Sequence, residues 1–336
     1  MSQRVHLIFN PASGQGDADA ELSEICSALQ TKFELSVSKT TPEIEAEFLA
    51  RKALEQGAEI IVVSGGDGTV SSVASALIES GAYLGIVPRG TANAFAKSLE
   101  IPENIAAACE VILEGAQQKL DMALCNDRPM LTIAGVGFEA EAVNRADREA
   151  KNKFGPLAYF IASLREIRNF ERFQVEIETE SGQMQASAAA VTIANAAPVT
   201  SVLAQGPDEI KVDDGLLDIT IVAPESASDV LIASYELLRS AITNDHAQRE
   251  NIGHFRAKQI KVSTDPAQKV VLDGEMIGTT PIEVKCLPSN LTVFVPASIT
   301  ETSDEKFKKK STRVTLANRM HHWWHSWTTD EAADKE

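Results

Sequence analysis

Apolar and polar residues alternate in blocks over the N-terminal part of the chain. Four short segments rich in apolar residues each predict a strand, and each is followed by a stretch with apolar residues at helical spacing. The four segments are residues 5–9, 33–37, 60–64 and 83–87. This βαβαβα rhythm predicts a doubly wound parallel sheet, a fold class that binds its ligand at the carboxyl ends of the strands.

The strand predicted at residues 60–64 ends in Gly65-Gly66-Asp67-Gly68-Thr69. Helical spacing begins at residue 70, so the glycines occupy a strand-to-helix corner. Backbone N–H groups and the helix dipole at such a corner can receive a phosphate. Asp67 would repel an anion there unless it holds Mg²⁺ or hydrogen-bonds a substrate hydroxyl. The alternative is a glycine-rich β-turn capped by the aspartate.

Two further loops fall at the same predicted edge of the sheet. Asn10-Pro11-Ala12-Ser13-Gly14-Gln15-Gly16 follows the first strand, and Pro88-Arg89-Gly90-Thr91-Ala92-Asn93 follows the fourth. Both contain the small and hydroxyl residues of phosphate-binding loops, although ordinary turns in α/β units have a similar composition. Arg89 and Lys97 could neutralise phosphate charge or lie on the surface as solvated cations.

The pattern changes near residue 135, where we expect the first domain, residues 1–134, to end. A helix at 105–113 and a hairpin strand at 129–134 would close this domain. Gly135-Val136-Gly137-Phe138-Glu139 is expected to open a helical stretch, with further helices at 156–167 and 227–241. The remaining elements are short strands at 173–177, 188–194, 217–222, 260–262, 270–272, 282–284 and 291–295. Residues 135–298 are therefore expected to form an antiparallel β-sandwich.

Two turns of the predicted β-domain carry carboxylates. Asp213 and Asp214 precede the strand at 217–222, where they could cap the turn or bind a hard cation together with nearby carbonyls. Asp273-Gly274-Glu275 follows the strand at 270–272, where the simplest interpretation is a hairpin turn.

Composition narrows the class of protein. Of the 336 residues, 44% are hydrophobic, which is enough for two domains with real cores. The chain has no apolar run of the ~20 residues that span a membrane, and its first residues lead directly into a strand, so we expect a cytoplasmic protein. The four cysteines have no paired spacing, which argues against a zinc site or a disulfide framework. The net charge of −17 argues against nucleic acid as a partner.

Together and in this order, the three loops and the two acidic turns resemble the diacylglycerol kinase catalytic family, specifically its bacterial soluble lipid kinases. The resemblance covers about residues 3–297. It implies a nucleotide-binding α/β domain and a β-sandwich domain that enclose a cleft. It also implies transfer of the γ-phosphoryl group of ATP to a lipid hydroxyl with Mg²⁺. An NAD kinase-like enzyme shares the Gly-Gly-Asp-Gly turn, but the Asp-Gly-Glu turn near the end of a long β-domain favours the lipid kinases.

Carried over by position, the resemblance implies three groups of site residues. The nucleotide would be bound by Asn10, Pro11, Ala12, Ser13, Gly14, Thr40, Thr41, Gly65, Gly66, Asp67, Gly68, Thr69, Thr91 and Asn93. Asp67 would lie at Mg²⁺ and the γ-phosphate, with Asp121 supporting this acidic network. Asp214, with the carbonyls of Lys211 and Leu216, would hold a second, structural Mg²⁺. Glu275 would be the general base, with Asp273 as the alternative, and the metal would contribute more than the base.

Two stretches depart from the family pattern. Family members usually have Asn-Glu where this chain has Ser71-Ser72, and Asp where it has Ala94. We interpret the chain as a divergent but active lipid kinase, most simply of diacylglycerol. The acceptor could instead be a sphingoid base, phosphatidylglycerol or another lipid alcohol. A catalytically silent lipid- or nucleotide-binding regulator is the alternative from a different class.

Residues 299–336 form a tail outside the resemblance. Residues 306–327 contain six basic residues, no acidic residue and all three tryptophans of the chain. Cations beside indole rings suit an anionic bilayer surface, so the tail could hold the enzyme peripherally at the inner face of the membrane. The alternative is a disordered, solubilising tail. The sequence leaves the oligomeric state open and is compatible with a homodimer.

Overall fold

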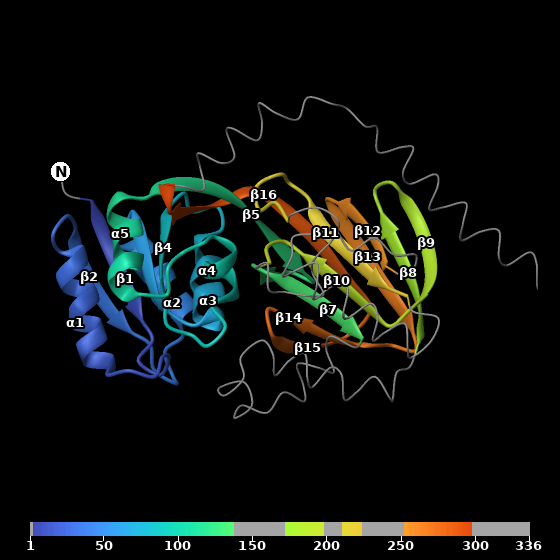
Figure 1. Ribbon diagram of the computed structural model, residues 1–336, viewed down its shortest axis with the longest axis horizontal. Helices are drawn as coiled ribbons and strands as arrows, with labels where there is room; N and C mark the ends of the chain where they lie inside the picture. Colours follow the sequence, from blue (N-terminus) through green and yellow to red (C-terminus); the bar gives the residue numbers. More distant parts are fainter. Residues whose placement is uncertain (1–2, 138–171, 198–209, 224–251, 298–336) are drawn as a thin grey trace, which may run out of the picture. The chain divides into compact units, whose positions relative to one another are not determined.

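Four parallel strands begin the fold in the computed structural model, which describes residues 3–137, 172–197, 210–223 and 252–297 (Figure 1). The strands are β1 (Arg4–Phe9), β2 (Glu34–Lys39), β3 (Ile60–Gly65) and β4 (Tyr83–Pro88). They lie in the order β2-β1-β3-β4, so β1 and β3 are central. The run of β-branched residues in β3 is buried along its whole length, as expected for a central strand of a doubly wound sheet. The predicted fold class of this part is confirmed.

Within residues 3–137, five helices accompany these strands. They are α1 (Ala18–Leu29), α2 (Ala46–Glu55), α3 (Asp67–Leu77), α4 (Ala94–Ser98) and α5 (Ile105–Glu114). Helix α1 begins after Asp17, whose carboxylate accepts hydrogen bonds from two backbone N–H groups of the first turn. Helix α1 packs against α5, and α2 packs against α3. Helix α3 starts directly after the glycines that end β3, which places its N-terminus at the carboxyl edge of the sheet.

Two packed sheets form the sandwich that follows. One is an antiparallel sheet that has six strands among the described residues, in the order β12-β11-β10-β7-β14-β15. Its strands are β7 (Ile133–Gly137), β10 (Ala190–Ala194), β11 (Leu217–Val222), β12 (Ile252–Ala257), β14 (Lys269–Leu272) and β15 (Glu275–Thr279). The other is formed by β5 (Ala116–Cys125), β6 (Arg128–Met130), β8 (Phe173–Thr179), β9 (Gly182–Ala188), β13 (Gln259–Asp265) and β16 (Ile282–Val295). Alternate residues of both sheets bury into one apolar core, which confirms the predicted sandwich.

Strand β16 joins the two parts of the fold. Its first half pairs antiparallel with β13, and Thr292 and Val293 in its second half pair parallel with Tyr83 and Leu84 of β4. The parallel strands and one layer of the sandwich therefore belong to a single ten-stranded sheet (Figure 1). The two strands predicted at 282–284 and 291–295 are in fact this one long strand.

The expected helix opening at residue 135 was wrong. Residues 133–137 form β7, which pairs with β10 on one side and β14 on the other. Two glycines within three residues disfavour a helix, while Ala134 and Val136 bury into the sandwich core. The predicted strand at 188–194 is divided between β9 and β10. The helices predicted at 156–167 and 227–241 lie outside the described residues.

Candidate active site

The three predicted glycine-rich loops meet at the carboxyl edge of the parallel strands. The backbone N–H of Asn10 donates to Ser64 O at 2.9 Å, and that of Arg89 donates to Gly65 O at 2.8 Å. Gly66 and Gly90 touch backbone to backbone, since a Cβ on Gly90 would lie 2.6 Å from Gly66 Cα. Only glycine permits this approach, which explains why both loops carry one at this point.

Side chains fix the first loop against the second. Asn10 Nδ2 donates to Thr69 Oγ1 at 2.8 Å, and Ser13 Oγ accepts from the backbone N–H of Gly66 at 3.3 Å. Around these contacts an exposed rim remains, formed by Pro11, Ala12, Gly14, Gly68 and Thr91. Thr40 follows the end of β2 at the same edge, where its backbone N–H donates a hydrogen bond to Phe9 O. The next residue, Thr41, is exposed, and its hydroxyl donates a hydrogen bond to Glu43 Oε2. The predicted nucleotide residues thus lie along one edge, with free backbone near the N-terminus of α3.

Asn93 shapes the third loop from within. Its Oδ1 accepts from the backbone N–H of Gly90 at 2.7 Å, and its Nδ2 donates to Gly90 O at 2.9 Å. The backbone of Asn93 has a positive φ of 49°, a conformation that asparagine tolerates better than most residues. Asn93 is buried, so we assign it to loop geometry beneath the exposed Thr91.

Asp67 is the first residue of α3 and faces the start of α4. Its Oδ1 accepts from the backbone N–H of Phe95 at 3.4 Å. Burial raises the pKa of Asp67, the backbone N–H groups of Phe95, Ala94 and Asn93 oppose that rise, and the charge of Asp273 adds to it. A single carboxylate in this position fits Mg²⁺ bound mainly by nucleotide phosphates, because Mg²⁺ commonly takes one or two protein carboxylates beside phosphate oxygens.

Arg89, one of the two predicted cations, lies inside the protein. Its guanidinium donates from Nε to Glu21 Oε2 at 2.7 Å and from Nη1 to Asn10 O at 2.9 Å, and it stacks 4.3 Å from the Phe9 ring centroid. Its side chain is 2% exposed. Gly14 leaves room for it, because a Cβ there would approach Nη2 to 3.0 Å. Arg89 therefore supports the first loop from below and does not face solvent.

Lys97, the other predicted cation, lies on the surface. Its ammonium group pairs with Glu103 at 3.0 Å, and both side chains are at least a third exposed. Lys97 is therefore the surface cation that the sequence left as the alternative, and it forms a solvated ion pair.

Asp273 is fully engaged by the chain around it. Its Oδ1 accepts from Thr132 N at 2.8 Å, from Thr132 Oγ1 at 2.6 Å and from Ile133 N at 3.1 Å. Its Oδ2 accepts from Leu131 N at 2.9 Å and from Ser71 Oγ at 3.3 Å. Both oxygens of this carboxylate already accept hydrogen bonds from the protein, so neither is available to a substrate hydroxyl. We therefore assign Asp273 a positioning role.

Glu275 has the opposite surroundings. Its side chain is exposed and makes no hydrogen bond or ion pair with any residue that the structure describes, while its backbone pairs with Leu272 in the β14–β15 hairpin. Its Oε1 lies 3.8 Å from the point where a Cβ on Gly68 would stand, so it faces the first turn of α3 beside Asp67. Of the two carboxylates in the Asp-Gly-Glu turn, Glu275 is the one free to accept a proton.

Asp121 and Asp214 belong to a separate region. Asp121 is buried, and its carboxylate accepts from Gly215 N at 2.6 Å and Ser289 N at 2.7 Å. It therefore supports the turn at Asp214, whereas a role beside Asp67 had been expected. Asp214 Oδ2 accepts from Arg256 Nη1 at 3.2 Å. Where a second Mg²⁺ was expected, the carboxylate has a guanidinium partner, so these residues do not fit a bound metal. In the described ranges no three His, Cys, Asp or Glu residues form a group that could hold a metal.

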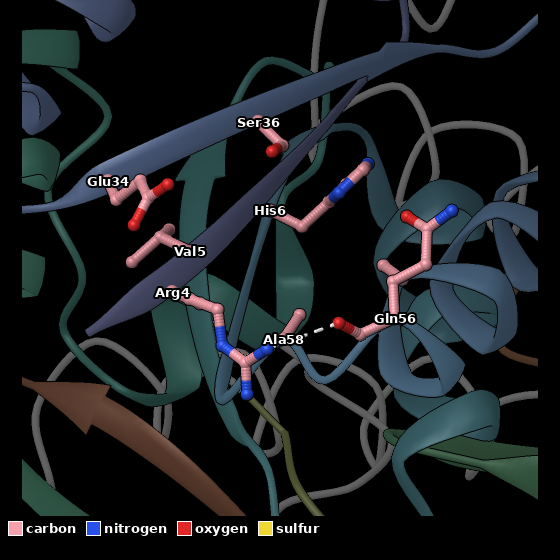
Figure 2. A pocket seen from close by; sticks show the side chains of 8 residues that line it. Arg4, Val5, His6, Glu34, Ser36, Gln56 and Ala58 are labelled. Atoms are coloured by element: carbon pink, nitrogen blue, oxygen red, sulfur yellow. Dashed lines mark hydrogen bonds between the residues drawn. The ribbon is translucent and has the colours of Figure 1, made fainter. Parts of the chain in front are cut away.

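A small hollow of about 80 Å³ lies at the opposite edge of the parallel sheet (Figure 2). It is lined by Arg4, Val5, His6, Glu34, Ser36, Ala53, Gln56 and Ala58. Arg4 Nη1 donates across it to Gln56 O at 3.4 Å, and burial lowers the pKa of His6. Because β1 begins at Arg4, this is the amino edge of the sheet, away from the glycine-rich loops. We do not assign the active site to it.

Comparison with known proteins places both parts of the chain. Residues 4–125 match the model of the diacylglycerol kinase catalytic domain, and residues 132–295 match that of the YegS C-terminal NAD kinase beta sandwich-like domain. An uncharacterised protein of Synechocystis is 47% identical over 87% of this chain and 70% of its own length. The diacylglycerol kinase of Bacillus subtilis is 27% identical over 90% of this chain and 100% of its own length.

A solved structure agrees with these sequence relatives. The crystal structure of a provisionally named diacylglycerol kinase from Bacillus anthracis superposes with a TM-score of 0.74 at 29% identity, covering 88% of this chain and 99% of that one. No helix of the described residues is long and apolar enough to cross a membrane.

Proposed function

The chain belongs to the diacylglycerol kinase catalytic family and is a lipid kinase, and we propose that it transfers the γ-phosphoryl group of ATP to a lipid hydroxyl with the help of Mg²⁺. Diacylglycerol is the simplest acceptor, with phosphatidic acid as the product. The names of the relatives support this acceptor, and the residues at the carboxyl edge of the sheet support the chemistry.

The observation that carries the proposal is the pair of carboxylates at the N-terminus of α3. Asp67 begins this helix, and the unengaged Glu275 faces its first turn. Phosphoryl transfer to an alcohol needs one carboxylate that can interact with a nucleotide-bound cation and one that can accept a proton. Here both lie next to the exposed backbone of the glycine-rich loops.

In this mechanism the backbone N–H groups of residues 67–69, at the N-terminal end of α3, bind the phosphates. Asn10 and Ser13 hold the loops in register through Thr69 and the N–H of Gly66. When Mg²⁺ is bound with the nucleotide, it neutralises phosphate charge, and Asp67 is the residue that would hold it. Glu275 accepts the proton of the lipid hydroxyl while the hydroxyl oxygen of the lipid forms a bond to the γ-phosphorus. The bond between the γ-phosphorus and the β–γ bridging oxygen breaks, and ADP leaves with that oxygen.

The departures from the family pattern are compatible with activity. Ser71 donates to Asp273, and Ser72 Oγ accepts from Glu47 N at the first turn of α2, at 3.1 Å. Each serine has a place in the fold around the site, and neither removes Asp67 or Glu275. This favours an active kinase over the silent regulator.

A lipid acceptor implies that the enzyme works at a membrane surface. We propose that the protein is cytoplasmic and reaches the inner face of the membrane peripherally, with the basic and tryptophan-rich tail as its contact. A homodimer is compatible with this arrangement.

Transfer from radiolabelled ATP to a panel of lipid alcohols tests the proposal. The panel contains diacylglycerol, a sphingoid base and phosphatidylglycerol, each with and without Mg²⁺. We expect Mg²⁺-dependent labelling of diacylglycerol. Labelling of another member alone would reassign the acceptor, and ATP binding without transfer to any lipid would leave the silent regulator.

A further inference from the structure

Arg256 connects two carboxylates at the turn where a structural metal was expected. It lies on β12 directly opposite Asp218 of β11. Its Nε donates to Asp218 Oδ1 at 2.8 Å, and its Nη1 donates to Asp214 Oδ2 at 3.2 Å. The Asp218 side chain is only 1% exposed, and those of Arg256 and Asp214 are 21% and 22% exposed. One guanidinium therefore joins the turn to the neighbouring sheet in a largely desolvated place.

The contacts of these carboxylates leave a poor set of metal ligands. The other oxygen of Asp214, Oδ1, accepts from the backbone N–H of Leu216 at 3.2 Å. Oδ1 of Asp218 also receives Nε2 of His254 at 3.1 Å. Mg²⁺ requires oxygen ligands at about 2.0–2.1 Å in near-ideal octahedral geometry. Donors occupy both oxygens of Asp214 and Oδ1 of Asp218, which leaves the buried Oδ2 of Asp218 as the one carboxylate oxygen of this pair without a hydrogen-bond partner among the described residues. A single such oxygen is too few for a Mg²⁺ site, and a fixed positive charge beside it opposes a divalent cation.

The turn also has its shape without a metal. Asp121 N donates to Val212 O at 2.7 Å, and the Asp121 carboxylate accepts from Gly215 N. Gly215 adopts a positive φ of 74°, which lets the chain reverse between these anchors. Both ends of the turn are thus fixed to β5 and β12 by the protein itself.

We propose that Arg256 is a built-in cation that takes the place of a structural Mg²⁺ at the Asp214 turn, so that this chain folds without a divalent ion there. The divalent cation used by the enzyme is then the one that accompanies the nucleotide. Arg256 is a positioning residue in this proposal, because it acts on the turn through Asp214 and Asp218.

Thermal unfolding of the full chain, without nucleotide, tests the proposal in EDTA and in increasing MgCl₂ up to about 10 mM. The melting temperature of the wild type is expected to stay within about 1 °C across the series, because no site takes up the ion. Arg256→Met should melt about 5 °C or more lower in EDTA, since two carboxylates lose their counter-charge in a desolvated place. Arg256→Lys should fall between the two, because it retains the charge but loses the two-carboxylate fork. Arg51→Met, at an exposed i,i+4 pair with Glu47, is the matched control and should change little.

Two results would overturn the proposal. One is a wild-type melting temperature that rises with Mg²⁺ in the absence of nucleotide and no longer rises in Asp214→Asn. The other is an Arg256→Met variant as stable as the wild type in EDTA. Neither readout depends on kinase activity, so a failure of the proposed function would leave this test intact.

Discussion

Ser71 Oγ on α3 donates a hydrogen bond to Asp273 Oδ2 at 3.3 Å, across a sequence separation of 202 residues. The same Asp273 oxygen accepts from the backbone of Leu131, and the other binds Thr132 and Ile133. Asp273 therefore fastens the turn that carries Glu275 to β7 and, through Ser71, to the helix that begins at Asp67. The distance between Asp67 and Glu275, the two carboxylates in the proposed mechanism, therefore depends on a third carboxylate that is already engaged by donors.

We expect Asp273→Asn to reduce kcat by about 10²-fold, because a small displacement of Glu275 is enough for such a loss. The asparagine amide would place an N–H group opposite backbone N–H groups that now donate to the carboxylate, and this repulsion would displace the turn. KM for ATP should change little, since the glycine-rich loops are elsewhere. Ser71→Ala, which removes one weak hydrogen bond worth about 1 kcal/mol or less, should have a milder effect. If Asp273→Asn instead abolished the acidic limb of the pH–rate profile, Asp273 would be the base.

Glu275→Gln should lower kcat by roughly 10²- to 10⁴-fold, the usual contribution of a positioned general base. The melting temperature should not fall, because the exposed side chain has no hydrogen bond in the part of the chain that the structure describes. Glu176→Gln, at an exposed position of β8, is the control and should retain full activity. Normal turnover by Glu275→Gln would show that the acceptor proton leaves by another route.

Asp67→Asn should remove most activity, on the order of a thousandfold, since a carboxylate that interacts with a cation contributes several kcal/mol. The same substitution should not lower the stability of the nucleotide-free protein, and can raise it at neutral pH. Burial raises the folded-state pKa of Asp67 above its unfolded value, so its charged form lowers stability as pH rises through the folded-state pKa.

In nucleotide-free protein, Asp67→Asn should therefore melt at or above the wild-type temperature at pH 7. The difference should shrink as pH falls and disappear at about pH 3, below the pKa of about 3.9 of an unfolded aspartate, where the side chain is protonated in both states. Thermal unfolding across this pH range checks the prediction. A variant that melted well below the wild type at pH 7 would assign Asp67 a structural role.

Sequence periodicity was sufficient for the parallel sheet and for the position of its glycine-rich loops. Residues 60–63 are all apolar and β-branched, which is typical of a parallel strand buried on both faces, and the loop after each strand of a parallel sheet falls at the same edge. Periodicity failed at 135–137, where two glycines resemble a break in the pattern. Ala134 and Val136 alternate into a core whose other side comes from residues far along the chain. The single strand β16 was also missed, since Pro288, Ser289 and Asn290 resemble a turn and form an irregularity in its pairing with β5.

The roles of individual site residues were less accessible from sequence. An arginine in a glycine-rich loop predicts a phosphate ligand or a surface cation, and nothing nearby in the chain shows that Glu21 and Phe9 enclose Arg89. Residues nearby in the chain also do not show that Asp273 accepts hydrogen bonds from residues 131–133, or that Arg256 donates to Asp218. These pairings are set by the tertiary fold and leave no local pattern.

Arg89→Met should raise KM for ATP by about tenfold while kcat changes less. The guanidinium holds Asn10 O and therefore the loop that we expect to surround the nucleotide. It should also lower stability by about 3–5 kcal/mol, the usual cost of breaking one side of a buried ion pair. Glu21→Gln combined with Arg89→Met should cost less than the sum of the two changes, because both remove the same pair. Additive effects, or an unchanged KM, would contradict a coupled support for the loop.

The tail at residues 299–336 lies outside the described residues, and its composition indicates a contact with an anionic bilayer. A protein with a net charge of −17 is repelled by an anionic bilayer, yet a lipid kinase must reach its substrate there. The segment 306–327 carries six cations and three tryptophans, and each cation near the surface contributes about 1 kcal/mol. Deletion of residues 305–336 should therefore weaken binding to anionic vesicles and slow phosphorylation of vesicle-borne lipid.

The deletion should spare activity on a short-chain lipid dissolved as monomer, because all the predicted catalytic and nucleotide residues precede residue 297. High salt should reproduce the deletion only in part, since it screens the cations but not the insertion of indole rings. Replacing the three tryptophans by alanine in the full chain should make vesicle binding fully salt-sensitive. Equal binding of the full-length and truncated proteins at low salt would exclude the tail as the membrane contact, and the enzyme would then have to reach the bilayer through the body of the protein.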